Sequence, residues 1–198
     1  MNSFYVQYGK RWFDFLVSLS GLLLLVVPLC LIGVWVWATD GAPILFRQER
    51  VGRRGRLFRI YKFRTMDNSA RQGTTITDVN DPRITKMGRW LRRFKLDELP
   101  QLFNVLKGDM SFVGPRPDVP GYMDKLKGEA VCLLELRPGI TGPATLAFRN
   151  EEELLARATD PKKYNDEVVF PEKVRLNLEY AKTMSLGKDI HYMLRSII

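Results

Sequence analysis

The sequence predicts a mostly helical α/β protein, with an N-terminal membrane segment over residues 1–40 and a small compact cytosolic domain over residues 41–198. Three observations support this prediction. An uncharged apolar run near the N-terminus is long enough to span a bilayer. Short strand-like and helix-like patterns follow it, and 198 residues suffice for one domain with an appendage. The formal charge of +9 predicts anionic partners such as phosphates, nucleotides or acidic lipid headgroups.

The apolar run extends without a charged residue from Phe15 to Ala38. It is too long for the apolar core of a signal peptide, and no small-residue cleavage site follows it, so a transmembrane helix is the default interpretation. Both flanks are basic, however: Lys10 and Arg11 precede the run and six arginines follow it by residue 59. Positive flanks favour the cytoplasmic side, and Pro28 predicts a kink near the middle. We therefore favour a re-entrant helix–break–helix over a spanning helix.

Short strands are predicted directly after this segment. Residues 44–46 and 57–63 have extended patterns, and the Arg- and Gly-rich residues 50–56 between them predict a basic turn. Such a turn is either a solvated hairpin tip or a contact for anionic headgroups, and the neighbouring membrane segment favours the second. The Thr-, Asn- and Asp-rich residues 67–82 predict a loop.

Amphipathic helices are predicted farther along the chain. Residues 84–94 have apolar positions three and four apart and cations elsewhere, a pattern that suits a membrane interface and, equally, a helix packed on a protein core. Further helices are predicted over residues 151–158 and from Pro171 onward. The apolar face of the first of these helices consists of Met87, Trp90, Leu91 and Phe94.

Two adjacent carboxylates, Asp97 and Glu98, precede a helical pattern that Pro100 would open and Gly108 would end. As an N-cap, Asp97 would stand where free N–H groups and the helix dipole favour anions. Neighbouring residues on a helix point in different directions, so one carboxylate could attack phosphorus while the other holds Mg²⁺. The alternative is that Asp97 only caps the helix and Glu98 only lies in its first turn.

Two further motifs resemble a phosphate-binding rim. Arg116 lies between Pro115 and Pro117, which stiffen the backbone on both sides of a guanidinium. A rigid guanidinium suits phosphate recognition because less order is lost on binding. Arg137 begins a similar Pro- and Gly-rich stretch that ends at Gly142. Either motif alone could be an ordinary turn.

The composition narrows the chemistry further. The chain has one histidine, His191, and two widely separated cysteines, Cys30 and Cys132, so a disulfide is not expected and a reducing compartment fits best. No Gly-rich phosphate loop ending in Gly-Lys-Ser/Thr, no Gly-x-Gly-x-x-Gly and no Asp-x-Asp is present. Chemistry would therefore depend on carboxylates together with arginines and lysines.

These motifs, in this order, resemble the bacterial sugar transferases, also called monotopic phosphoglycosyl transferases, in their small form that consists of the catalytic domain alone. The resemblance covers nearly the whole chain. The segments that carry it are residues 10–14, 46–52, 61–66, 96–101, 114–117 and 137–142.

The resemblance implies an activity. Such enzymes transfer a phosphosugar from a UDP-sugar to polyprenyl (undecaprenyl) phosphate, giving a polyprenyl diphosphosugar and UMP, as the first membrane step of a bacterial glycoconjugate pathway. By this resemblance, Asp97 would be the nucleophile that carries a covalent phosphosugar in a ping-pong cycle, and Glu98 would bind Mg²⁺. Arg116 would engage phosphate. Further residues at or near the site would be Lys62, Arg92, Pro115 and Arg137.

The resemblance also implies a location and partners. The helix broken at Pro28 would leave both ends on the cytosolic face of the bacterial inner membrane, with the phospholipid bilayer as a partner. Nucleic acid is not expected to bind, and a homodimer is left open. Three positions depart from the commoner family pattern: Val27 replaces a serine, Asn177 replaces an aspartate found in some members, and residues 143–150 differ, which would mark a sugar-preference subgroup.

Two other functions remain as alternatives. A non-catalytic basic membrane adaptor that binds anionic lipid or nucleic acid would explain the charge and the anchor, but it leaves the carboxylate pair and the two rigid arginines without a role. A membrane phosphatase that forms an aspartyl phosphate would use the same residues. The adaptor should tolerate Asp97→Asn, and the phosphatase should not require a polyprenyl phosphate.

Overall fold

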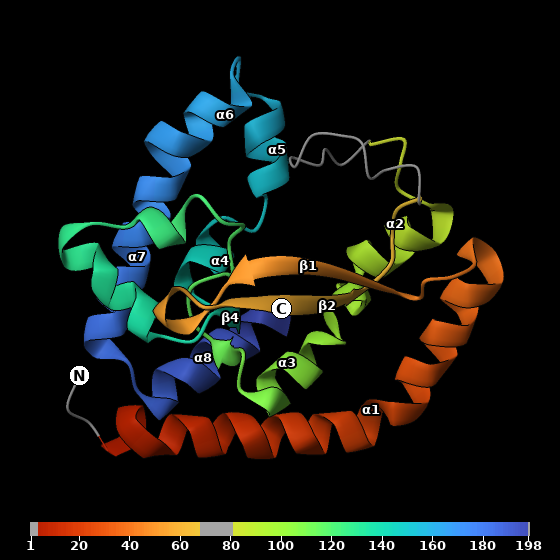
Figure 1. Cartoon of the computed structure of the whole chain (residues 1–198), viewed down its shortest axis with the longest axis horizontal. Helices are drawn as coiled ribbons and strands as arrows, with labels where there is room; N and C mark the ends of the chain where they lie inside the picture. Colours follow the sequence, from red (N-terminus) through yellow and green to blue (C-terminus); the bar gives the residue numbers. More distant parts are fainter. Residues whose placement is uncertain (1–3, 68–80, 198) are drawn as a thin grey trace.

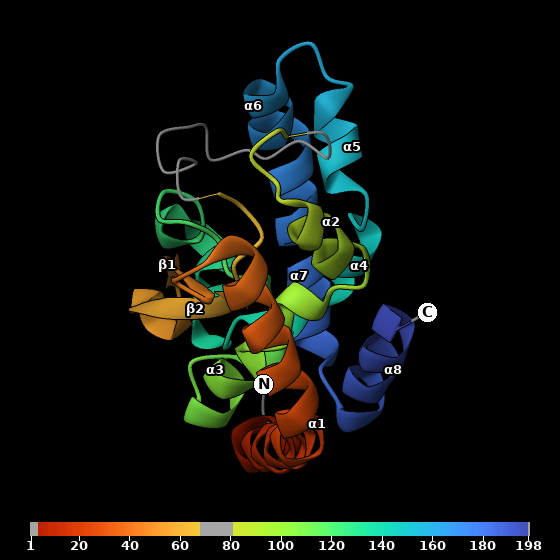
Figure 2. The same cartoon turned by 90° about the vertical axis from the view of Figure 1, so that its right-hand side faces the viewer.

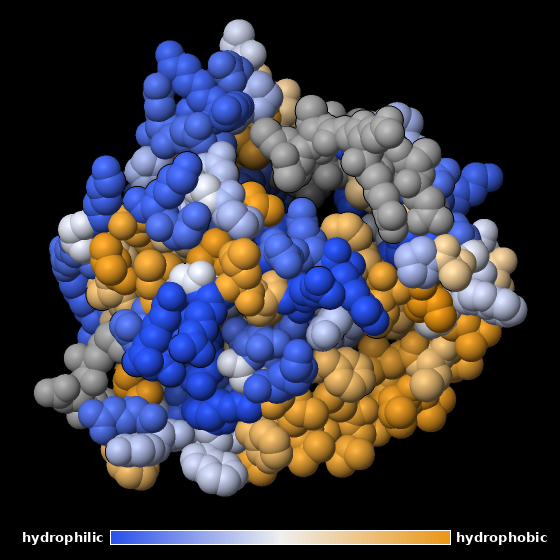
Figure 3. All heavy atoms as spheres, viewed as in Figure 1, coloured by the Kyte–Doolittle hydropathy of each residue, from blue (hydrophilic) through white to orange (hydrophobic). Residues whose placement is uncertain are grey.

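The computed structural model describes residues 4–67 and 81–197, so most of the loop predicted over residues 67–82 lies outside the described residues. A short π-helical turn, η1 (Tyr5–Gly9), leads into the long helix α1 (Lys10–Asp40). Within the described residues, Tyr5–Asp40 forms one helix that is long and apolar enough to cross a membrane, judged by length and composition alone. Apolar side chains gather along the lower right edge of the surface, over α1 (Figure 3).

Helix α1 is continuous through Pro28, and its ribbon changes direction between a first and a second arm (Figure 1). Such a bend is expected because a proline inside a helix removes one backbone hydrogen bond and clashes with the preceding turn. Most of the apolar residues of α1 stay exposed, among them Leu24 and Val27, and Val27 occupies the position before the proline. The helix is bent but uninterrupted, so its re-entrant course through a membrane stays a prediction.

Both arms of α1 pack on the rest of the chain. The first arm lies along α3 (Gln101–Lys107), where Arg11 donates from its two terminal nitrogens to the carbonyl oxygens of Val105 and Leu106, both at 2.7 Å. The second arm contributes Val36 to a buried apolar cluster, and the Trp35 ring lies 5.4 Å from the Trp90 ring. Figure 2 shows the first arm end-on beneath the body of the molecule and the second arm rising beside it.

A β-hairpin follows α1, as predicted. Strand β1 (Leu45–Val51) pairs antiparallel with β2 (Leu57–Phe63), and a 3₁₀ turn, η2 (Arg53–Gly55), forms the basic tip. The second strand has the predicted bounds, and the first is longer than predicted because its whole length pairs with β2.

Helix α2 (Lys86–Arg93) confirms the amphipathic pattern and divides its apolar face. Met87 and Leu91 are buried against α1 and β2, as in an ordinary core helix. Trp90 and Phe94 are 43% and 55% exposed, with their rings 5.1 Å apart. The two exposed rings could contact a membrane interface, and that role for α2 stays a prediction.

A parallel pair of short strands, β3 (Ser111–Val113) and β4 (Gly139–Thr141), brings two distant segments together behind α3. Gly114 and Gly139 are required there, because a Cβ on either residue would collide with the backbone of the other segment. Two 3₁₀ segments lie between these strands, η5 (Met123–Lys125) and η6 (Gly128–Glu135).

The C-terminal part is helical and packs on the main core. The helices predicted at residues 151–158 and from Pro171 are confirmed as α5 and α7, although α5 ends earlier. Asn177 is buried on α7, and its side-chain oxygen has no hydrogen-bond partner among the described residues. Cys30 and Cys132 are exposed free thiols. The elements are α4 (Pro143–Ala147), α5 (Glu151–Ala156), α6 (Pro161–Tyr164), η7 (Asn165–Val169), α7 (Phe170–Thr183) and α8 (Leu186–Ile197).

A buried carboxylate fastens α8 to the start of α1. Asp189 accepts hydrogen bonds from the Tyr5 hydroxyl at 2.6 Å and from the Tyr180 hydroxyl, and it pairs with the Lys10 ammonium at 2.5 Å. Burial, followed by the charge of Asp189 and its hydrogen bond, raises the pKa of Tyr180. Helix α1 is therefore tied to the body at its N-terminal end by an ionic, hydrogen-bonded network.

Candidate active site

Asp97 and Glu98 lie in a 3₁₀ turn, η4 (Leu96–Glu98), rather than at the N-cap of α3. The predicted cap is therefore wrong: α3 begins at Gln101, with Pro100 in the capping position and no side-chain capping bond. The backbone N–H groups of Glu98 and Leu99 are already bonded within the turn. Lys95 starts this turn with a left-handed backbone (φ 54°), a conformation uncommon outside glycine.

Glu98 is held by two cations that converge on one oxygen. Its Oε1 accepts from the Lys62 ammonium at 2.6 Å and from the Arg116 guanidinium at 3.0 Å. The Glu98 side chain is 17% exposed. Burial raises the pKa of this carboxyl, but Arg116 and Lys62 outweigh that effect and lower the pKa to about 2. Glu98 is therefore fully ionised at neutral pH.

Asp97 has the opposite environment. It is 8% exposed, and burial, followed by the negative charge of Glu98, raises its pKa above the usual range for aspartate. Lys62 and Arg92 oppose that shift from nearby. Two adjacent carboxylates whose pKa values move in opposite directions are suited to different tasks.

Two of the predicted phosphate-binding cations therefore adjoin the carboxylate pair. A third, Arg92, projects from α2, and its Nε donates to the Thr65 hydroxyl at 3.0 Å. Arg116 is 42% exposed, and the charge of Glu98 raises its pKa. Lys62, Arg92 and Arg116 come from β2, α2 and the loop after β3, so the fold assembles one cationic site from three separate segments.

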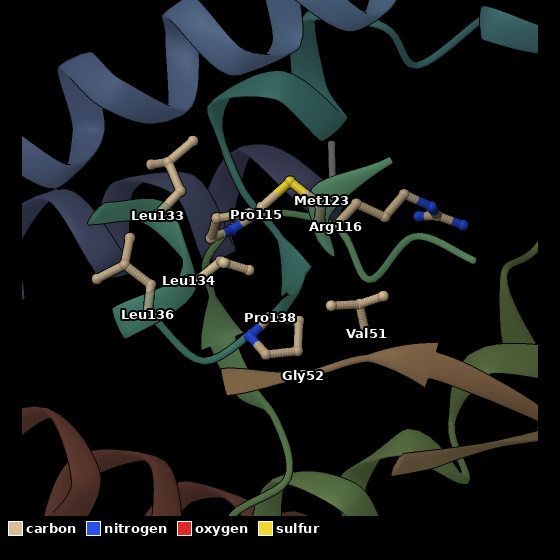
Figure 4. Close-up of a pocket in the computed structure, with 9 residues that line it drawn as sticks. All are labelled: Val51, Gly52, Pro115, Arg116, Met123, Leu133, Leu134, Leu136 and Pro138. Atoms are coloured by element: carbon tan, nitrogen blue, oxygen red, sulfur yellow. The ribbon is translucent and has the colours of Figure 1, made fainter. Parts of the chain in front are cut away.

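The backbone at Arg116 is supported from behind. A cavity of about 10 Å³, lined by mostly apolar residues, lies behind the loop, and the Arg116 side chain extends away from them (Figure 4). Pro115 is buried, and its carbonyl accepts from the Gly139 N–H at 2.7 Å. Pro115 therefore acts as a support for Arg116, while the guanidinium points outward.

Arg137 is not brought to the carboxylate pair. Its Nε donates to the Gly108 carbonyl at 2.9 Å, at the C-terminal end of α3, whereas Asp97 and Glu98 precede the N-terminal end. Only the backbone that follows Arg137 lies beside the Arg116 loop, since the Gly139 N–H donates to the Pro115 carbonyl at 2.7 Å. The Arg-Pro pattern thus gave no information on the direction of the Arg137 side chain, and the phosphate-binding rim stays a prediction.

A second layer of charge, not predicted from the sequence, lies next to Arg116. Arg50, at the end of β1, donates to the Pro117 carbonyl at 3.2 Å, and burial, followed by the charge of Arg116, lowers its pKa. Asp118 is nearby, and burial raises its pKa. Arg50 lies in the basic stretch of the hairpin, but no local signal separates it from the exposed arginines at the tip.

The residues present fit a magnesium ion held in the way that Mg²⁺ prefers, by one or two carboxylates together with phosphate oxygens and water. The described residues hold no group of three or more His, Cys, Asp or Glu that could form an all-protein metal cage. Glu98 is ionised and half-buried beside Asp97, and its two cationic partners share one oxygen. The donor set thus suits an ion that arrives with a phosphate substrate.

Comparison with known proteins gives matches over nearly the whole chain. It is 36% identical to the galactosyl transferase CpsE of Streptococcus agalactiae and 38% identical to an undecaprenyl-phosphate glucose phosphotransferase of Komagataeibacter xylinus. These matches cover 96% and 95% of this chain but only 41% and 35% of those proteins. The chain therefore spans about two fifths of the length of such relatives.

A relative of similar size is the exopolysaccharide production protein ExoY of Rhizobium meliloti, which is 32% identical over 96% of this chain and 84% of its own length. The family model described as bacterial sugar transferase matches residues 5–198. The chain belongs to the bacterial sugar transferase family.

Proposed function

We propose that this protein transfers a phosphosugar from a UDP-sugar to undecaprenyl phosphate, forming undecaprenyl diphosphosugar and UMP. The observation that carries the proposal is the carboxylate pair of η4, in which cations keep Glu98 ionised while Asp97 stays buried beside them. Relatives named as undecaprenyl-phosphate glucose and galactose phosphotransferases support the reaction class.

In the proposed first step, a carboxylate oxygen of Asp97 attacks the phosphorus that bears the sugar. The bond between this phosphorus and the bridging oxygen breaks, and UMP leaves with that oxygen. The products of this step are an aspartyl phosphosugar and UMP. In the second step, a phosphate oxygen of undecaprenyl phosphate attacks the same phosphorus and restores the Asp97 carboxylate.

The cations of the site supply charge for both steps. Lys62 and Arg92 lie close enough to Asp97 to affect its pKa, so they favour the ionised nucleophile. Arg116 is half-exposed on a rigid backbone and would contact the phosphate oxygens that gain charge in the transition state. Arg50 and Lys95 extend the positive field around the rim.

Glu98 would hold the magnesium ion together with phosphate oxygens of the donor. When bound, Mg²⁺ would neutralise charge on the diphosphate. Lys62 and Arg116 orient Glu98 for this role through the oxygen that they share. Because its pKa is about 2, Glu98 would keep its charge throughout the physiological pH range.

The proposed location is the cytosolic face of the bacterial inner membrane, where a soluble donor and a lipid acceptor can meet. Support comes from the exposed apolar surface of α1, from its change of direction in Figure 1 and from Pro28 within it, which together suit a re-entrant helix. The exposed Trp90 of α2 and Phe94, the residue that follows α2, would lie at the same interface.

The test is mass spectrometry of the intact protein after incubation with Mg²⁺ and a panel of UDP-sugars, without lipid acceptor. We expect a mass increase equal to one phosphosugar together with UMP release, both absent in Asp97→Asn. Asp109→Asn is the matched control, because Asp109 follows the opposite end of α3 and pairs with Lys107. The donor that gives the adduct also identifies the sugar.

Other outcomes separate the alternatives. UMP formed only after undecaprenyl phosphate is added, with no adduct at any time, would replace the covalent step with direct transfer. Release of free sugar phosphate that does not depend on acceptor would indicate a phosphatase. No adduct and no UMP with any donor would favour a non-catalytic adaptor.

A further inference from the structure

A second cavity, larger and more polar than the one behind the Arg116 loop, lies at the far end of α3 from the carboxylate pair. Its volume is about 420 Å³, and residues of η1, α1, η2, β3 and the segment around residue 136 line it. The start of α1 forms one wall, so the cavity opens beside the proposed membrane segment. Its charged lining residues are Lys10, Arg11, Asp14, Arg53, Glu135 and Arg137.

Two guanidinium groups of this cavity act on a third, that of Arg137. Burial lowers the pKa of Arg137, and the positive charges of Arg53 and Arg11 lower it further. Arg11 and Arg137 donate to main-chain carbonyls at the end of α3, which carry only partial negative charge. The positive charge of Arg11 and Arg137 is therefore not cancelled by a carboxylate. Lys10 differs because it pairs with Asp189, and Arg53 differs because its guanidinium lies 3.6 Å from the Glu135 carboxylate. An anion in the cavity would relieve this repulsion.

Asp14 supplies a second, independent feature. It is 1% exposed; its Oδ1 accepts from the Phe112 N–H at 3.1 Å, and its Oδ2 has no hydrogen-bond partner among the described residues. A buried acceptor without a partner is costly. A ligand that carries a hydrogen-bond donor beside its anionic group would satisfy Asp14 and the arginines together.

We infer that this cavity binds the headgroup of a membrane glycerophospholipid. Its phosphodiester lies near Arg11, Arg53 and Arg137, and a headgroup hydroxyl or ammonium donates to Asp14. A lipid is favoured over free phosphate because the cavity wall is the start of α1, whose apolar side is exposed. Hydrophilic residues gather around the hairpin tip above this arm of α1 (Figure 3). The inference rests on the proposed membrane association but not on the proposed catalytic chemistry.

The experiment is native mass spectrometry of the purified full chain in a neutral detergent, titrated with phosphatidylglycerol. We expect one lipid to be retained and its binding to saturate. The phosphatidylglycerol concentration needed for half-saturation should be about tenfold higher or more in Arg53→Gln, as expected for loss of one charge-assisted contact. Arg137→Gln should have the same effect, and Arg137→Lys should restore part of the binding. Arg56→Gln is the matched control, because it removes the same charge from the hairpin tip outside the cavity lining.

Several results would overturn the inference. They are the absence of a single saturating lipid, equal weakening by Arg56→Gln, and retention of phosphatidylcholine, which lacks a headgroup donor, as strongly as phosphatidylglycerol. Displacement of the lipid by inorganic phosphate at an equal concentration would assign the cavity to free phosphate instead. Arg53 is 42% exposed, so Arg53→Gln keeps the test valid if Arg137→Gln fails to fold. Vesicle co-sedimentation and UMP release report membrane association and catalysis separately.

Discussion

The two ends of α3 are both surrounded by cations, but those cations bind different partners. Before the N-terminal end, Lys62 and Arg116 bind the carboxylate of Glu98. At the C-terminal end, Arg11 and Arg137 bind main-chain carbonyls. The first arrangement fixes an acidic group in a cationic site, and the second caps a helix while leaving positive charge uncompensated.

This difference explains how one short helix can separate two kinds of site. A carboxylate cancels a full charge, so the cations beside Glu98 can orient it and still share their donors with a phosphate. A helix C-terminus carries only about half a negative charge, so two arginines there keep a net positive charge. The first end is suited to chemistry, and the second is suited to holding an anion or to stabilising the helix alone.

The largest expected effect is at the first end. Asp97→Asn removes the proposed nucleophile without changing its size, so turnover should fall on the order of 10³-fold or more. The measurement is UMP release with donor and acceptor at saturation. Asp109→Asn should stay within a few-fold of the wild type, and an equal loss in that control would show that carboxylates near α3 act through folding.

The second prediction separates the two carboxylates by pH. Asp97 must be ionised to attack, and its pKa is raised, so the rate of UMP release without acceptor should fall as the pH is lowered through that pKa. Glu98→Gln removes a negative charge that helps to raise the pKa of Asp97. The acid limb should therefore move to lower pH, while the overall rate drops about 10²-fold. A limb that keeps its position would contradict the coupling of the pair.

The features around α3 that could be predicted from the sequence depend on local signals. The hairpin, the end of α3 at Gly108 and the carboxylate pair all follow from residue types within a few positions of one another. Gly108 has φ 91°, as a helix-ending glycine requires. The prediction of Asp97 as a helix cap was wrong because the chain forms a 3₁₀ turn that starts at Lys95 in a left-handed conformation. Glycine is the usual residue in that conformation, so a lysine gives no sequence signal for the turn.

What sequence could not predict depends on tertiary packing. Arg50 and Arg116 meet because the end of β1 pairs with the backbone at Asp118, a contact between segments far apart in the chain. Arg137 has the same Arg-Pro signature as Arg116, yet its side chain binds the other end of α3. A motif fixes the local backbone, and the neighbours across the fold decide where the side chain points.

The third prediction tests the second end of α3. Arg11→Gln removes the donors to the Val105 and Leu106 carbonyls, so the free energy of unfolding should fall by about 1–3 kcal/mol. Thermal unfolding in detergent measures this change. Arg56→Gln should change the stability by less than about 0.5 kcal/mol, because exposed residues without buried contacts rarely matter more. A loss in Arg11→Gln no larger than this would remove the capping role from Arg11.

The smallest expected effect concerns Lys107, which lies in the last turn of α3. Its ammonium is 3.3 Å from the Asp109 carboxylate, and its side chain is 58% exposed. Solvent screens this pair, so Lys107→Gln should lower the free energy of unfolding by less than about 0.5 kcal/mol, and added salt should abolish the difference. The same thermal measurement at low and high salt tests both statements. A loss as large as that of Arg11→Gln, unaffected by salt, would mean that any cation at this helix end contributes equally. The proposed difference between Arg11, which binds main-chain carbonyls, and Lys107, which is exposed to solvent, would then be wrong.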